Sequence, residues 1–210
     1  SGARIVHSCG FDSIPSDLGV RHLQEAAQTQ FGSYCEKVKM RVVKMKGGAS
    51  GGTVASGLNV YREAAKDPAL QAELRDSYSL CPQGHDFTLR QPSVGVEYDD
   101  DMKSWAGPFI MASINTRIVL RSNALWPNHY SNNFLYDEAL LLGDGEKGHK
   151  AAKKLAFGMK WGMTAMAIAP IRAFAQRFFL PKPGEGPTPE QQLNGMFDLH
   201  FIGTTEAGDK

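Results

Sequence analysis

This chain of 210 residues has few cysteines and almost no net charge. The three cysteines, Cys9, Cys35 and Cys81, are odd in number and widely spaced, which argues against a disulfide framework and against a CxxC metal site. Low cysteine use is typical of a reducing compartment, so we expect a cytoplasmic protein. The net charge is only +1 and no long basic run occurs, so nothing favours nucleic acid as a partner.

Long apolar runs are also missing. The uncharged stretch at 161–171 falls short of the roughly twenty residues that a bilayer span needs. It lies within residues 146–180, a predicted helical segment with basic first turns, which Pro170 should kink or divide. Two interpretations stay open. The segment is either a helical hairpin inside the protein or a peripheral membrane contact through 147–180, because basic residues beside Trp, Met and Phe suit an interface.

The chain also lacks the complete dinucleotide-binding fingerprint, in which a strand, a G-x-G-x-x-G turn and an acidic residue about twenty positions later occur together. It has no initiator methionine and enters a predicted strand at 5–6, directly after its first residues. We therefore expect this chain to be part of a longer protein, with any such fingerprint before Ser1.

What the sequence does contain is glycine turns placed at helix starts. Within 4–18, a β-branched strand ends at Cys9-Gly10, and Ser13 and Pro15 mark the start of a helix with Ser13 as its expected cap. α/β proteins use a strand, a glycine turn and a helix N-terminus to hold an anionic or polarisable ligand. The alternative is an ordinary βα connection of the usual short length.

A second glycine-rich loop occupies 46–53, where four glycines require either turns or close approach of a ligand to the backbone. It imitates the start of a Walker loop, but Thr53-Val54 stands where Lys-Ser/Thr is required, which excludes nucleoside triphosphate binding. Thr53 is expected to cap the following helix. Gly51, Gly52 and Thr53 are thus candidate ligand contacts, with a plain turn as the alternative.

Charged residues on a predicted strand and turn look solvated. Alternation at 37–42 predicts a half-buried strand with Lys37, Lys39 and Arg41 on its solvent-exposed face. The acidic triplet at 99–101 lacks the glycine and glutamate of an EF-hand loop, so it is interpreted as a solvated turn.

Other candidate ligands are isolated. Arg117 and Arg121 lie in a predicted helix at 110–125 and could grip a carboxylate or phosphate with two hydrogen bonds, or form surface ion pairs. Cys81 and His85 lack partners at metal-ligand spacing, so no metal site is expected.

Helical and strand-like patterns alternate along the chain, which predicts an α/β (α+β) fold. The predicted helices span 13–27, 54–65, 68–76, 110–125 and 146–180, with one further turn near 188–191. The predicted strands span 37–46, 94–98, 134–142 and 195–205.

Four segments, 10–18, 48–53, 114–125 and 181–187, together resemble the saccharopine dehydrogenase-like oxidoreductases. The likeness is greatest to the branch that includes the trans-acting enoyl reductases. It runs through nearly the whole chain, with the motifs in the family's order. Members of that family begin with a Rossmann domain that binds NAD(P), followed by a domain with a mixed β-sheet flanked by helices that carries substrate and oligomer contacts.

The resemblance implies a division and a set of site residues. Residues 1–33 would be the last strand–helix unit of the cofactor domain, and 34–210 the substrate and oligomerisation domain with helical segment 146–180. The implied cofactor contacts are Cys9, Gly10 and Phe11. The implied catalytic residues are Asp12, Ser13, Asn115 and Arg117. The implied substrate contacts are Gly51, Gly52, Thr53 and Arg121, and no metal ligand is implied.

We therefore expect the substrate-domain part of an NAD(P)-dependent oxidoreductase that reduces a C=C, C=O or C=N bond of a small, lipid-type molecule. This chain by itself is expected to bind no cofactor and to be inactive. A homo-oligomer is expected. The alternatives are a non-catalytic relative that binds lipid or a membrane surface, and a homodimerising interaction module.

Overall fold

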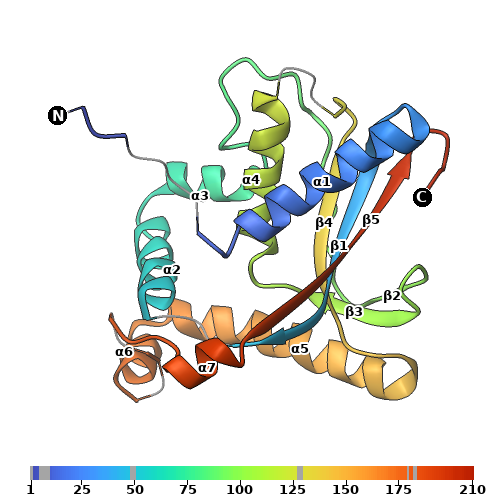
Figure 1. The fold of residues 1–210 in the computed structure, drawn as a ribbon. Helices are drawn as coiled ribbons and strands as arrows, with labels where there is room; N and C mark the ends of the chain where they lie inside the picture. Colours follow the sequence, from blue (N-terminus) through green and yellow to red (C-terminus); the bar gives the residue numbers. More distant parts are fainter. Residues whose placement is uncertain (1, 5–9, 48–50, 127–129, 179, 182–183) are drawn as a thin grey trace.

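The computed structural model describes residues 2–4, 10–47, 51–126, 130–178, 180–181 and 184–210 (Figure 1). These residues build a five-stranded sheet in the order β2-β3-β4-β1-β5. Its strands are β1 (Cys35–Lys46), β2 (Glu97–Asp99), β3 (Ser104–Pro108), β4 (Leu135–Leu141) and β5 (Met196–Thr205). β1 and β4 run parallel, whereas the other neighbouring pairs are antiparallel. The predicted α/β fold, with a mixed sheet flanked by helices, is confirmed.

β1 forms the centre of the hydrophobic core because its apolar residues alternate with charged ones. Val38, Met40 and Val42 are buried on one face of the sheet, where they join the main core cluster. Val38 lies opposite Tyr136 of β4 on one side and opposite Gly203 of β5 on the other.

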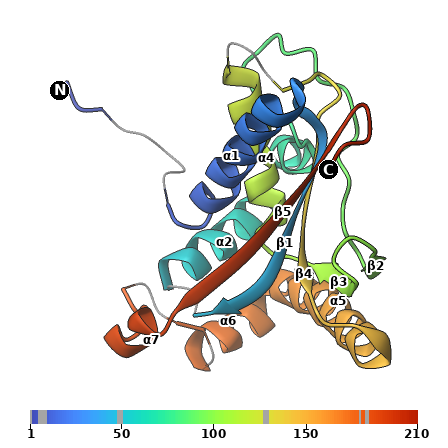
Figure 2. The ribbon, with the colours of Figure 1, turned by 45° about the vertical axis from the view of Figure 1, so that its right-hand side comes forward.

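Two helices, α1 (Ile14–Phe31) and α4 (Ala112–Leu125), cover this face (Figures 1 and 2). α1 is joined to β1 by the buried Gln24, whose Nε2 donates to the carbonyl of Cys35 at 2.8 Å. Its Oε1 accepts the Cys35 N–H at 2.6 Å, so the amide continues the hydrogen bonding of the strand. α1 therefore shares one core with the sheet, and the domain division at residue 33 stays a prediction about the whole protein.

The remaining helices are α2 (Gly51–Ala64), α3 (Pro68–Arg75), α5 (Gly145–Ala167), α6 (Ala169–Phe178) and α7 (Pro189–Leu193). The predicted helical segment 146–180 is divided at Ile168, just before Pro170, as the proline requires. α5 packs against β3, where Gly107 leaves room for Leu155. α5 and α6 lie at the opposite end of the molecule from α1 and α4 (Figures 1 and 2).

Some sequence predictions need correction. β3 was not predicted, because its Gly-Pro ending is typical of a turn, and β2 begins at Glu97 rather than at 94. Thr53 does not cap α2, because the helix already begins at Gly51, whose N–H donates to the carbonyl of Glu185 at 2.8 Å. The predicted strand at 5–6 lies outside the described residues.

Candidate functional site

A buried polar network joins the start of α1 to α4 and β4. The hydroxyl of Ser13 donates to Oδ1 of Asn115 at 3.0 Å. Nδ2 of Asn115 donates to Glu138 Oε2 at 2.9 Å and to Ser16 Oγ at 3.1 Å. The Tyr136 hydroxyl donates to the other oxygen of Glu138 at 2.7 Å. Two predicted catalytic residues, Ser13 and Asn115, are thus brought into direct contact across 102 positions of sequence.

The network is nearly closed to solvent, and Ser13, at 4% exposed, is its most exposed member. Asn115 is 1% exposed and Glu138 is 2% exposed, and Tyr136 is fully buried. Burial raises the pKa of the Glu138 carboxyl, against the opposing effect of hydrogen bonds from Tyr136, Ser16 and Asn115. Burial also raises the pKa of the Tyr136 hydroxyl well above its ordinary value, and the neighbouring Glu138 adds to that effect.

The network fixes which way the Asn115 amide points. Glu138 presents acceptor oxygens, so the NH₂ group of Asn115 must face it, and the amide oxygen must face Ser13. The Ser13 hydrogen is therefore committed to Asn115, and its oxygen keeps lone pairs that can accept a further hydrogen bond. This differs from the expected capping role, because the Ser13 side chain forms no capping hydrogen bond to α1.

The turn before α1 lies beside this network. The carbonyl of Gly10 accepts the N–H groups of Ser13 at 3.3 Å and Ile14 at 3.1 Å. Phe11 and Asp12 are exposed, and the Phe11 ring meets Phe197 of β5 with 5.7 Å between centroids. Cys9, the remaining predicted cofactor contact, lies outside the described residues.

Exposed apolar side chains occur within a few residues of Ser13 and of Asn115 in the sequence. They are Phe11, Ile14, Ile110 and Ile114. An apolar surface around a polar anchor is the usual composition of a site for a small organic ligand.

The predicted catalytic residue Arg117 and the predicted substrate contact Arg121 bind backbone carbonyls. Arg117 donates to the carbonyl of Asp76 at 3.1 Å and to those of Ser113 and Leu74, and Arg121 donates to the carbonyl of Leu80. These contacts hold α4 against the end of α3 and the segment that follows it.

The predicted contacts Gly51, Gly52 and Thr53 form the first turn of α2. Gly51 of this turn donates its N–H to the carbonyl of Glu185 and not to a residue of the Ser13 network. Residues 48–50 of the same loop lie outside the described part of the chain.

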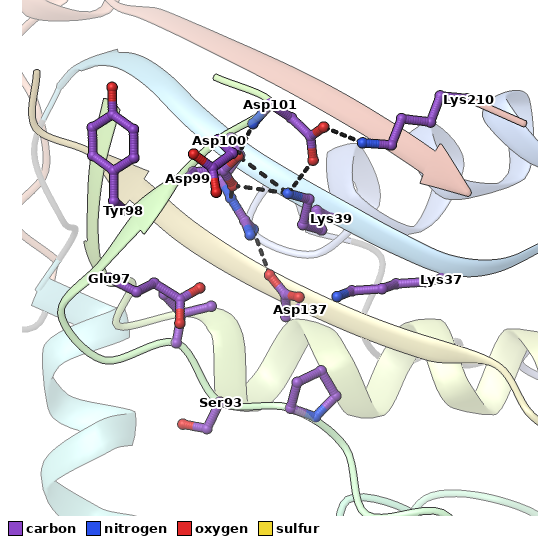
Figure 3. Close-up of a pocket in the computed structure, with 13 residues that line it drawn as sticks. Lys37, Lys39, Ser93, Glu97, Tyr98, Asp99, Asp100, Asp101, Asp137 and Lys210 are labelled. Carbon is purple, nitrogen blue, oxygen red and sulfur yellow. Dashed lines mark hydrogen bonds and ion pairs between the residues drawn. The ribbon is translucent and has the colours of Figure 1, made fainter. Parts of the chain in front are cut away.

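A second polar cluster lies on the opposite face of the sheet, around a cavity of about 340 Å³ (Figure 3). Arg41 is buried between two carboxylates, donating to Asp99 at 2.6 Å and also to Asp137. Lys39 contacts Asp99 at 3.1 Å and pairs with Asp101. This corrects the prediction of a solvated face. Of the three strand cations, Lys37 is exposed, whereas Lys39 is partly buried and Arg41 is buried.

The acidic triplet at 99–101 was predicted to be a solvated turn, but Asp99 is buried and Asp101 is paired with Lys39 and Lys210. Burial alone would raise the pKa of Asp99, but hydrogen bonds from Arg41 and Lys39 outweigh it and lower that pKa. Hydrogen bonds from Lys210 and Lys39 lower the pKa of Asp101 to about 2. The cluster is therefore a set of mutually neutralised charges that fastens the β2–β3 hairpin to β1 and β4.

No three His, Cys, Asp or Glu side chains in the described part of the chain come together as metal ligands. Within the same residues, none of the helices has both the length and the apolar character needed to cross a membrane.

The fold and the network define an α/β chain with a mixed sheet and a polar anchor buried beside a glycine turn. No protein-family model matches the chain, and no solved structure matches it. Curated proteins do match over 99% of its length.

A Mycobacterium tuberculosis protein, provisionally named a trans-acting enoyl reductase, is 35% identical over 222 residues. Proteins named trans-acting enoyl reductase from Mycobacterium ulcerans and Mycobacterium bovis are 34% and 33% identical. The chain spans about half, 52%, of the length of each of these relatives. These relatives support the enoyl-reductase branch of the resemblance drawn from the motifs.

Proposed function

We propose that this chain is the substrate-side part of an NAD(P)-dependent oxidoreductase that reduces the C=C bond of an enoyl compound. The observation that carries the proposal is the identity of 33–35%, over 99% of the chain, to proteins named trans-acting enoyl reductase. The buried anchor at Ser13, beside an exposed glycine turn, supports a ligand site in the place that the motifs indicated.

The residues at the turn suit the nicotinamide end of the cofactor. When bound, NAD(P)H supplies the hydride for the reduction. The Ser13 oxygen would accept a hydrogen bond from the carboxamide NH₂ group, because its own hydrogen is committed to Asn115. Gly10 and Phe11 would hold the ring against this anchor. The G-x-G-x-x-G of this chain, at 143–148, has no acidic residue about twenty positions later, and the Asp144 side chain already caps the helix that it opens. A cradle for the pyrophosphate would therefore have to come from another part of a longer protein.

The substrate would be an apolar, lipid-type enoyl compound. Phe11, Ile14, Ile110 and Ile114 provide exposed apolar surface beside the anchor, which suits an acyl chain better than a charged metabolite. Burying that surface against the substrate would exclude water from the reacting carbons.

The proposal is tested on the full-length protein in two steps. NADPH is titrated by its fluorescence, and its oxidation is then followed with 2-enoyl and 3-oxoacyl thioesters of increasing chain length. We expect NADPH binding and faster oxidation with the enoyl compounds, increasing with chain length. Failure of the full-length protein to bind either NADPH or NADH would overturn the proposal, and preference for the oxo compounds would replace C=C by C=O reduction.

The role of Ser13 is tested by comparing Ser13→Ala with Ser122→Ala. Ser122 is a matched serine on α4 that donates to Asp17 at 2.9 Å, one helical turn of α1 beyond Ser13. We expect Ser13→Ala to weaken NADPH binding or lower kcat at least about tenfold, the loss expected for one well-placed hydrogen bond. Ser122→Ala should leave both parameters within about twofold.

A further inference from the structure

The outer surface of α5 and α6 exposes large aromatic side chains. Phe157 and Trp161 in α5 are 65% and 55% exposed, and Phe174 and Phe178 in α6 are 58% and 62% exposed. The rings occur as two pairs, with 5.9 Å between the Phe157 and Trp161 centroids and 4.9 Å between those of Phe174 and Phe178. Grouped exposed aromatic residues of this kind mark an interaction surface.

Lysines share this surface on α5. Lys150, Lys153, Lys154, Phe157 and Trp161 follow one another at spacings of three or four residues, or side by side, and so lie on one side of the helix. All five are exposed. Within the part of the chain that the structure describes, Lys150 pairs with Glu146 at 2.7 Å, and no carboxylate contacts Lys153 or Lys154.

Positive charge is concentrated in these two helices. Together α5 and α6 hold seven Lys and Arg residues and a single Glu, whereas the whole chain has a net charge of only +1. Their surface is therefore basic on a protein whose remaining surface is acidic overall. That asymmetry selects for a negatively charged partner.

We propose that the exposed surface of α5 and α6 docks onto an anionic lipid surface, with the helices lying along it. The aromatic rings would enter the headgroup layer while the lysines contact lipid phosphates, the arrangement of interfacial amphipathic helices. A second copy of the chain suits the surface less well, because a two-fold axis would bring this basic surface against its own copy. The proposal is independent of the reductase activity.

Docking is tested with the full-length protein by co-sedimentation with vesicles. Pure phosphatidylcholine vesicles are compared with vesicles that also contain phosphatidylglycerol, at low and at high salt. We expect binding to the anionic vesicles that falls several-fold at high salt, and at least about tenfold weaker binding to pure phosphatidylcholine.

The charge contribution is isolated with a matched pair of double variants. Lys153→Glu with Lys154→Glu should weaken binding to anionic vesicles more than about tenfold, since each lysine near a charged membrane contributes roughly 1 kcal/mol. Arg62→Glu with Lys66→Glu makes the same change in net charge outside α5 and α6. That control should retain most of the binding.

The aromatic contribution is isolated in the same way. Phe157→Ser with Trp161→Ser should weaken binding about tenfold or more, because both rings lose their place in the headgroup layer. Val60→Ser with Leu193→Ser removes exposed apolar side chains elsewhere and should bind normally. Thermal unfolding of each variant shows that the fold is retained, as expected for exposed positions.

Three results would overturn the proposal. They are no binding to anionic vesicles, equal binding to both vesicle types, and equal losses in the test and control variants. A dimer seen by sedimentation that Phe157→Ser with Trp161→Ser dissociates, without vesicle binding by either form, would assign the surface to self-association instead.

Discussion

The side-chain NH₂ group of Asn115 on α4 donates to the Glu138 carboxylate on β4 at 2.9 Å, and the oxygen of the same amide accepts the hydroxyl hydrogen of Ser13. One side chain thereby links α1, α4 and β4. The stability of the fold and the geometry of the proposed cofactor anchor consequently depend on the same residue.

Asn115→Ala should destabilise the protein by about 2–4 kcal/mol, because it leaves Ser13 and Glu138 without a buried partner and opens a cavity. Urea denaturation measures the loss. The matched control is Asn59→Ala on α2, where the exposed side chain donates to Glu63 at 2.8 Å and should cost less than about 0.5 kcal/mol. Equal losses in the two variants would contradict the structural role of the network.

Glu138 should make stability decrease as the pH rises. Its pKa is raised in the folded protein above the ordinary value of 4.5, so the folded state binds more protons than the unfolded state above that pH. The stabilising contribution is complete below pH 4.5 and is lost as the pH rises through the folded-state pKa.

Glu138→Gln should therefore flatten the dependence of the unfolding free energy on pH from about pH 4.5 to pH 7. Glu73→Gln, at an exposed position, is the control. Its unfolding free energy should depend on pH with the same slope as that of the parent protein. An unchanged slope in Glu138→Gln would show that its carboxyl is not responsible.

Arg41→Met should cost about 3–5 kcal/mol, because it takes the counter-charge from the buried Asp137 and one of two cationic partners, Arg41 and Lys39, from Asp99. Arg21→Met is the comparison, since Arg21 pairs with Glu25 at 2.8 Å on the exposed side of α1 and should cost less than about 1 kcal/mol. Chemical denaturation of both variants at one pH gives the difference. Similar losses of unfolding free energy in the two variants would contradict the burial of the Arg41 ion pairs, because they would mean that water screens those charges.

Gly19→Ala should destabilise the protein by about 1–3 kcal/mol, although alanine favours helices, because a Cβ at this position would overlap the Phe201 ring. Gly57→Ala in α2 meets open space and should stabilise by up to about 1 kcal/mol. Thermal unfolding of the two variants should show a lower melting temperature for Gly19→Ala and a higher one for Gly57→Ala. Phe201→Leu introduced into Gly19→Ala should recover part of the loss, and failure to do so would place the strain elsewhere.

The sequence was sufficient for the elements that depend on local patterns. Alternation of charged and apolar residues predicted β1, and Pro170 predicted the division between α5 and α6. β3 was missed because Gly107 and Pro108 are typical of turns, and its strand character comes from pairing with β4.

The site was predictable only in part. Ser13 and Asn115 were both singled out, but their contact spans 102 positions and no local pattern encodes it. Glu138 gave no signal, because a glutamate in a strand is ordinarily solvated. Arg41 was likewise expected on the solvent-exposed face of the sheet. Its buried partner Asp99 lies 58 positions away, so no local pattern indicates the pair. Long-range pairing of polar groups is what the sequence left open.

The place of β1 in the sheet also determines how late in synthesis the sheet can form. β1 ends at Lys46, yet its two neighbours begin only at Leu135 and Met196. During synthesis this strand therefore leaves the ribosome with both edges unpaired, and its second edge stays unpaired until β5 has been made. Such late closure is slow and exposes the nascent strand to pairing with other molecules. A message truncated before β5 would accordingly yield an aggregation-prone polypeptide rather than a shortened but folded one.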